Sequence, residues 1–165
     1  MQKLISFIDQ INEQLGKFFS LATIALVLLI SLEVLMRYVF NTSIIWLAEL
    51  ETYFFVLIFL LSAGYAFKYD KHVRVDLFYS KFSEKRKAWV NLIGGIFLLL
   101  PWSGVIVWYT AQFAYRSFEI GEKSAQPDGL PMLWILKFFI FFGFCFLFLQ
   151  GIASILRSIQ TIRKK

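Results

Sequence analysis

The chain is poor in residues that build chemical sites. Cys145 is the only cysteine and His72 the only histidine among 165 residues. One cysteine excludes an intrachain disulfide, a thiol relay or a cysteine metal cluster, and one histidine excludes bis-histidine haem ligation within the chain. His72 and Asp76 match a five-residue H-x-x-x-D acyltransfer signature, but no acyl pocket motif or nucleophile–base constellation accompanies them. We therefore expect neither enzyme activity nor a cofactor or metal held by this chain.

Charge is also scarce. Charged residues make up 17% of the chain and hydrophobic residues 59%, against about 25% charged in soluble domains. Four long apolar runs lie near residues 18–36, 44–67, 88–115 and 132–156. Each is long enough to cross the ~30 Å hydrocarbon core as a helix, and continuous runs of this length exclude barrel strands. We predict an all-α integral membrane protein with four transmembrane helices, forming a single membrane domain over residues 1–165.

The segments outside the apolar runs alternate between many and few basic residues along the chain. Thirteen Lys and Arg lie before the first run, between the second and third runs, or after the fourth. The opposite side carries Arg37, Arg116 and Lys123, with Lys137 just inside the fourth run. Cytoplasmic segments carry the Lys and Arg excess, so both termini and the middle loop are expected in the cytoplasm. The net charge of +6 therefore indicates topology and attraction to membrane lipids, not nucleic acid binding.

Two amphipathic segments flank the apolar runs. Residues 2–17 place Leu4, Ile5, Phe7, Ile8, Ile11 and Leu15 at near-helical spacing. This pattern is typical of an interfacial helix that lies on the cytoplasmic surface before the chain turns into the bilayer, or of a segment that contacts a partner directly. A second interfacial helix is predicted from Asp76 to Phe82, and Ser83 is expected to cap the third membrane helix.

The third run is too long for a straight crossing. Its 28 uncharged residues would span about 42 Å at 1.5 Å per residue. We expect the helix to tilt or bend, with a kink at Pro101 and close helix approach at Gly94 and Gly95. The external loop near residues 116–131 is rich in glycine and proline, which predicts an ordered turn region.

Acidic residues stand near the ends of the runs. Glu33 lies four residues before Arg37, a spacing that favours a same-face ion pair, although Glu33 can also snorkel to the outer interface. A third interpretation makes Glu33 an ion-coupling carboxylate, since small multidrug exporters also place a Glu in their first helix. The alternative function is therefore a self-contained exporter that acts as a homodimer.

Further polar and aromatic residues stand near the ends of the second and fourth runs, and two of them, Glu49 and Lys137, have two interpretations. Glu49 and Glu51 open the second run, where acids favour the positive end of the helix dipole; alternatively Glu49 pairs with Arg37 across the short external connection. Trp46 falls where an interfacial belt aromatic is expected. Lys137 either snorkels outward or meets an acid on another helix.

A family resemblance rests on the order and spacing of these polar residues. The matching stretches are Arg37–Glu49, Gly64–Lys68 followed by His72–Asp76, and Lys123–Pro131 followed by Lys137. Together they resemble the small membrane subunits of tripartite ATP-independent periplasmic (TRAP) transporters, the DctQ-like family. The family often shows adjacent acids after the tryptophan, whereas Leu50 separates the two acids here.

The resemblance implies partners and a location. A periplasmic solute-binding protein would capture an organic acid, of the C4-dicarboxylate or sialic acid type, and a large membrane subunit would move it together with Na⁺. This chain would form a heterodimer with that large subunit in the bacterial inner membrane and act as its scaffold. Na⁺ would bind to the partner subunit.

The same resemblance suggests which residues carry the scaffold. Arg37, Trp46 and Glu49 would fix the outer hairpin, and Lys68, His72 and Asp76 would order the cytoplasmic loop. The structural and partner-interface candidates are therefore Arg37, Trp46, Glu49, Lys68, His72, Asp76 and Lys137.

Overall fold

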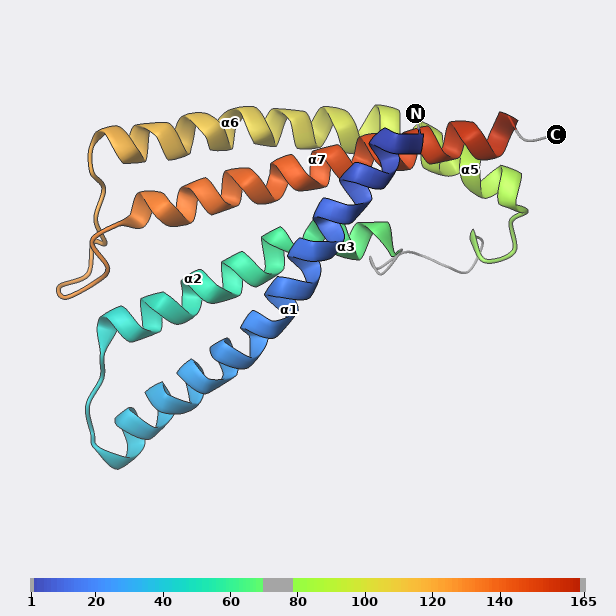
Figure 1. Cartoon of the computed structure of the whole chain (residues 1–165). Coiled ribbons are helices and arrows are strands. Elements are labelled where there is room, and N and C mark those ends of the chain that lie inside the picture. Colours follow the sequence, from blue (N-terminus) through green and yellow to red (C-terminus); the bar gives the residue numbers. More distant parts are fainter. Residues whose placement is uncertain (1, 70–78, 164–165) are drawn as a thin grey trace.

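The structure is a computed structural model that describes residues 2–69 and 79–163, and these residues form helices and loops without a strand. Helix α1 spans Gln2–Val39, α2 spans Ile45–Leu61, and the short α3 spans Ala63–Lys68. The third crossing consists of α5 (Glu84–Gly94), the π-helix η1 (Gly95–Leu99) and α6 (Leu100–Glu119). Helix α7 spans Leu133–Arg163, and Figure 1 shows the arrangement.

Four helical segments of the described chain are long and apolar enough to cross a membrane: Gln2–Val39, Ile45–Lys68, Glu84–Glu119 and Leu133–Arg163. The predicted four-span, all-α fold is confirmed. Most of these helices extend well beyond the apolar runs. The helical backbone hydrogen bonds continue into the neighbouring polar segments, whose side chains can bond water or form ion pairs.

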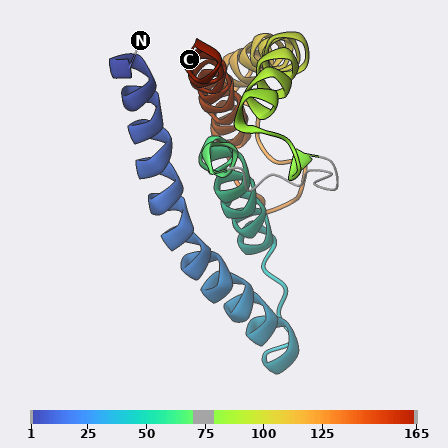
Figure 2. The same ribbon diagram turned by 90° about the vertical axis from the view of Figure 1, so that its right-hand side faces the viewer.

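The long helices form an open layer. Helix α2 packs against α1 and α7, and α7 packs against α2 and α6, while α6 packs mainly against α7 (Figures 1 and 2). Helix α7 is the central element, because 28% of its apolar window is buried, against 6% for the third crossing. Much of the apolar surface on the other helices therefore faces outward.

Helix α1 differs from the prediction. It continues without a break through residues 2–39, so the predicted turn into the bilayer after residue 17 is wrong. Ile5 and Ile8 are buried with Ala153 of α7, and Figure 1 shows the N-terminal part of α1 crossing α7. Part of the apolar face of segment 2–17 is therefore used for packing within the chain, whereas Leu4 and Phe7 stay 50% and 62% exposed.

The third crossing bends near its predicted place. Five residues before Leu100 form the π-helix η1, and Pro101 follows at the start of α6. Proline lacks an N–H and its ring crowds the carbonyl four residues earlier, here Phe97, so the irregular turn lies before the proline. Gly95 packs closely on α7, since an added Cβ would lie 2.7 Å from Ile155 Cγ1.

The loops agree with the sequence in part. Ser83 caps α5 by accepting a hydrogen bond from the Arg86 N–H, at 3.4 Å, as predicted. The external loop is ordered by backbone bonds such as Ser124 N–H to Leu130 O and Leu133 N–H to Glu122 O, both 3.1 Å. Of the predicted interfacial helix from Asp76 to Phe82, residues 76–78 lie outside the described residues. Residues 80–82 form a turn instead of a helix, in which the Phe82 N–H donates to the Tyr79 carbonyl at 3.1 Å.

Candidate functional site

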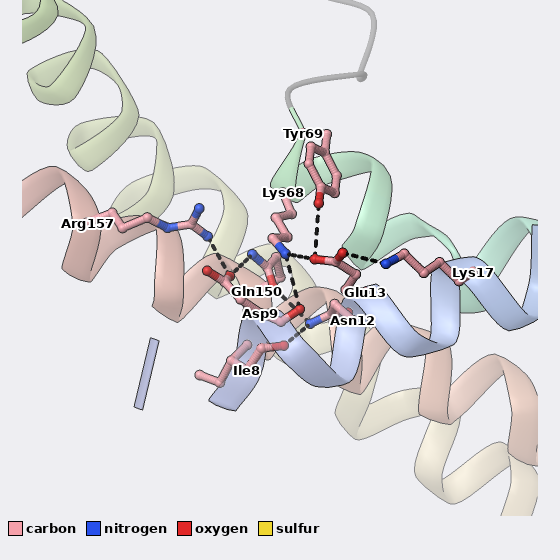
Figure 3. A network of polar contacts seen from close by, with 9 residues as sticks. All are labelled: Ile8, Asp9, Asn12, Glu13, Lys17, Lys68, Tyr69, Gln150 and Arg157. Carbon is pink, nitrogen blue, oxygen red and sulfur yellow. Dashed lines mark hydrogen bonds and ion pairs between the residues drawn. The ribbon is translucent and has the colours of Figure 1, made fainter. Parts of the chain in front are cut away.

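Two polar clusters hold the helices together, one at each end of the layer. The first lies at the end where both chain termini lie, and we call it the terminal network (Figures 1 and 3). Its members are Asp9, Asn12, Glu13, Lys17, Lys68, Tyr69, Gln150 and Arg157.

The centre of the terminal network joins α1 to α7. Asn12 is 1% exposed and Gln150 is 0% exposed. The Asn12 Nδ2 group donates to Gln150 Oε1 at 2.8 Å and to the Ile8 carbonyl at 3.1 Å. Gln150 Nε2 in turn donates to Asp9 Oδ1 at 3.0 Å, and Arg157 Nη2 donates to the same oxygen at 2.9 Å. Buried polar groups are costly unless bonded, so this chain of bonds fixes how α1 crosses α7.

Lys68 joins the end of α3 to the same region of α1. Its Nζ lies 2.5 Å from Glu13 Oε2 and 3.4 Å from the Asp9 carbonyl oxygen. The Tyr69 hydroxyl donates to Glu13 Oε2 at 3.0 Å, and Lys17 Nζ lies 2.8 Å from Glu13 Oε1. Lys68 therefore anchors the start of the loop that it was predicted to order, while His72 and Asp76 lie outside the described residues.

Small residues allow this close approach. A Cβ added at Gly64 would overlap the Asn12 side chain, and one added at Gly16 would overlap the Tyr65 ring. Gly64 opens the Gly64–Lys68 motif, so one motif supplies both the close contact and the cation that bonds α1.

The second cluster, which we call the loop cluster, comprises Glu49, Ser124 and Leu130 together with Glu122 and Lys137. Glu49 accepts a hydrogen bond from the Ser124 hydroxyl and another from the Leu130 N–H at 2.7 Å. Glu49, one turn into α2, therefore holds the external loop. The two acids on either side of Leu50 differ in their surroundings. Glu49 has two hydrogen-bond partners in the loop, whereas Glu51 Oε1 is buried and has no hydrogen-bond partner among the described residues.

Of the two interpretations of Glu49, the bond to Arg37 across the external connection is wrong. Arg37 Nη2 instead bonds Glu33 Oε1 one helical turn away, which confirms the same-face pair. Glu33 is buried while Arg37 is exposed, so the pair neutralises the carboxylate at little conformational cost. Trp46, on the first turn of α2, is 46% exposed.

Lys137 meets an acid instead of snorkelling outward. It is buried, and its Nζ pairs with Glu122 Oε2 and lies 3.8 Å from the centre of the Phe113 ring. The acid comes from the external loop and not from another helix. The Lys137 ammonium holds the pKa of the Glu122 carboxyl below its ordinary value of 4.5, because a nearby cation favours the charged carboxylate.

Sequence reasoning missed several partners in both clusters. Asp9, Glu13 and Gln150 were not singled out, nor was Glu122. The acids of segment 2–17 lie on its polar face, and their use becomes visible only when α3 and α7 are placed against that face. Both clusters bond one element to another, so their chemistry is structural.

The comparisons with known proteins agree with this picture. Residues 26–161 match the family model for tripartite ATP-independent periplasmic transporters, DctQ component. No curated protein matches the chain. The matched range includes α2, α3, α5 and α6, most of α7, the whole loop cluster, and the Lys68, Tyr69, Gln150 and Arg157 members of the terminal network. The chain therefore belongs to the DctQ family and is a small membrane subunit of a TRAP transporter.

Proposed function

We propose that this chain is a non-catalytic scaffold for the large membrane subunit of a Na⁺-coupled, binding-protein-dependent TRAP transporter of organic acids. The open layer of helices is the observation that carries the proposal. A closed bundle would bury most of its apolar side chains, whereas this layer leaves many of them exposed. Phe55 and Phe59 of α2, for example, stack on one another and are 62% and 68% exposed. An apolar surface of this extent suits lipid and the helices of a membrane partner.

The placement of charge supports a scaffold over a self-contained exporter. In the described helices, ionisable groups stand toward the ends of the spans, and a carrier needs such groups along its own pathway. Glu33 was the strongest argument for an exporter. Its carboxylate is bonded to Arg37, so it is engaged in a structural pair and not presented to a substrate.

The distribution of Lys and Arg supports an orientation. Both termini lie at the end of the layer that includes α3 and α5 (Figure 1), and the nine of the thirteen basic residues that the structure describes belong to segments at this end. The positive-inside rule places this end in the cytoplasm of a bacterial inner membrane. The loop cluster would then face the periplasm, where a solute-binding protein delivers the substrate.

Substrate selection would reside in the other subunits. A C4-dicarboxylate or a sialic acid is the substrate type that we propose for the complete transporter. This chain would supply helix surfaces, and Na⁺ would bind to the large subunit.

The test measures substrate uptake by the large subunit and the binding protein, with and without this chain. We expect uptake only when the chain is present, and we expect the large subunit to co-purify with it. Full Na⁺-driven uptake without the chain would contradict a scaffold role. The variant Glu33→Gln separates the two hypotheses, because a scaffold keeps most of the uptake whereas a self-contained exporter loses transport.

A further inference from the structure

An apolar groove follows the bend of the third crossing. It has a volume of about 900 Å³, and its lining includes Gly94, Phe97, Leu98, Pro101, Trp102 and Val105. Residues Tyr79 and Phe82 close one side of it and Ser154 of α7 contributes from another. The lining residues between Val90 and Val105 extend over fifteen residue steps, or about 22 Å of helix. This length exceeds half of the ~30 Å hydrocarbon core.

The groove is open at Gly94, which has no side chain, and it is bordered by exposed apolar side chains. A Cβ added at Gly94 would meet no atom within 4 Å. Trp102 is 70% exposed, and Phe97 and Leu98 are similarly exposed. In a membrane protein such a surface is filled by acyl chains or by another helix.

A polar pocket of about 310 Å³ continues the groove toward the chain termini. The two share Phe67, Tyr79, Asn91 and Ser154 in their linings. The pocket adds three cations, Lys68, Lys87 and Arg157, and the hydroxyl-bearing residues Ser158 and Thr161; Glu84 is its one lining acid. The apolar groove thus ends in a set of cationic donors, while the Ser158 and Thr161 hydroxyls donate to backbone carbonyls of α7.

The three cations have ion-pair partners but keep donors to spare. Lys68 pairs with Glu13, Arg157 with Asp9 and Lys87 with Glu84. An ammonium offers three N–H donors and a guanidinium five, so a single carboxylate does not satisfy either. Arg157 Nε is buried and has no hydrogen-bond partner among the described residues.

The surrounding surface is strongly positive. Among the described residues, this end of the layer carries nine Lys and Arg, namely Lys3, Lys17, Lys68, Lys81, Lys85, Arg86, Lys87, Arg157 and Arg163. It carries three acids, Asp9, Glu13 and Glu84. The local potential therefore favours an anionic ligand.

We propose that the groove and the pocket together bind one anionic phospholipid. An acyl chain lies in the groove, and the phosphate headgroup accepts hydrogen bonds from Lys87 and Arg157. Basic pockets between membrane helices are known binding sites for anionic headgroups. A partner helix would explain the apolar groove but not the donors gathered at one end of it. The proposal goes beyond the scaffold role and does not depend on it.

The experiment measures lipid retention by the purified full-length chain. The protein is equilibrated in nanodiscs of equal phosphatidylglycerol and phosphatidylcholine, extracted, washed with detergent and weighed by native mass spectrometry. We expect one phosphatidylglycerol to remain bound in preference to phosphatidylcholine. Equal retention of both lipids, or of neither, would overturn the proposal.

Two matched pairs of variants locate the site. Gly94→Phe adds a ring to the groove lining, at a position where a Cβ would meet no atom within 4 Å, and should abolish retention. Ile93→Phe, one residue away on the exposed surface, should not. Lys87→Gln should lower the preference for phosphatidylglycerol about fivefold, since one cation near a headgroup contributes about that factor. Lys85→Gln, exposed on the same helix, should leave the preference unchanged.

Each pair also has a result that contradicts the proposal. Retention that survives Gly94→Phe would place the lipid elsewhere. An unchanged preference in Lys87→Gln would remove headgroup recognition. If the co-purified large subunit excludes lipid from the wild-type groove, the occupant is a protein helix and the proposal is wrong. Circular dichroism and size-exclusion profiles establish that each variant is folded.

Discussion

At the scale of single residues, the pair Asn12 and Gln150 offers the sharpest test of the terminal network. Replacing Asn12 with Ala removes the 2.8 Å bond and leaves the Gln150 oxygen buried. We expect the free energy of unfolding to fall by about 1–2 kcal/mol. The Gln150 oxygen gives up its hydrogen bonds to water on folding, and in the variant no partner replaces them. Unfolding in mixed detergent micelles measures the change.

The double variant separates the bond from other effects of truncation. Gln150→Ala added to Asn12→Ala should cost less than the sum of the single changes, by about 0.6–1.7 kcal/mol, the range found for hydrogen bonds between membrane helices. Gln10→Ala, on the exposed face of α1, serves as the control and should be neutral. Strict additivity of the two single variants would show that the bond contributes no coupling.

The pair Glu122 and Lys137 makes stability sensitive to acid. Lys137 holds the pKa of Glu122 below its ordinary value of 4.5, so the folded state favours the charged carboxylate. The resulting stabilisation is complete above the ordinary pKa and is lost as pH falls through the lower folded pKa.

We therefore expect the melting temperature of the wild type to fall more steeply below pH 4.5 than that of Glu122→Gln. The variant lacks this titrating group and should already be less stable at pH 7. Glu119→Gln, at the exposed end of α6, is the matched control. Parallel pH profiles for the wild type and Glu122→Gln would remove the ion pair as a source of acid sensitivity.

Contacts between two side chains were predictable where both residues lie on the same helix, one turn apart. The spacing of Glu33 and Arg37 is enough to bring their side chains together on one face, and the structure has this pair. Glu49 was assigned the wrong partner, because its bonds to Ser124 and Leu130 depend on how a distant loop folds over α2. Sequence separation, not residue type, limited the prediction.

At the scale of elements, the amphipathic character of segment 2–17 was evident from its spacing. Its surroundings were not, because a helix with one apolar face can lie on a membrane or against another helix. The burial of Ile5 and Ile8 against α7 accompanies the continuation of α1 as one helix through residue 17. The choice depended on polar partners at Gln150 and Lys68, far away in the chain.

Gly64 tests how closely α3 must approach α1. A Cβ there would overlap Asn12 and lie 3.4 Å from the Phe146 carbonyl oxygen of α7. We expect Gly64→Val to cost about 1–3 kcal/mol, as overpacking typically does, and to shift unfolding in micelles accordingly. Gly104→Ala is the control, since its Cβ would make an ordinary 3.5 Å contact with Phe148 and alanine favours the helix. Equal stability of both variants would show that α3 can move away from α1 at no cost.

At the scale of the whole molecule, the number of crossings was predictable and their arrangement was not. Hydropathy reports how many helices enter the bilayer, and four such segments are present. It does not distinguish a side that faces lipid from a side that faces another apolar helix, because both environments are equally apolar. The open layer and the central position of α7 therefore required the structure.

Charge asymmetry does lead to a prediction about orientation. Among the described residues, the end with both termini carries nine Lys or Arg and three Asp or Glu, while the end with the loop cluster carries four Lys or Arg and six Asp or Glu. Moving the more positive end across the membrane is unfavourable, so we expect Ser6 in the cytoplasm and Ala125 outside.

Single cysteines at these exposed positions, in a Cys145→Ala background, test the prediction with a membrane-impermeant maleimide. Ala125→Cys should react in intact cells, and Ser6→Cys should react only after the membrane is permeabilised. The Cys145→Ala chain alone controls for background labelling. The reverse pattern would invert the molecule, place the terminal network and its lipid pocket on the outer face, and remove the loop cluster from the side where a solute-binding protein would dock.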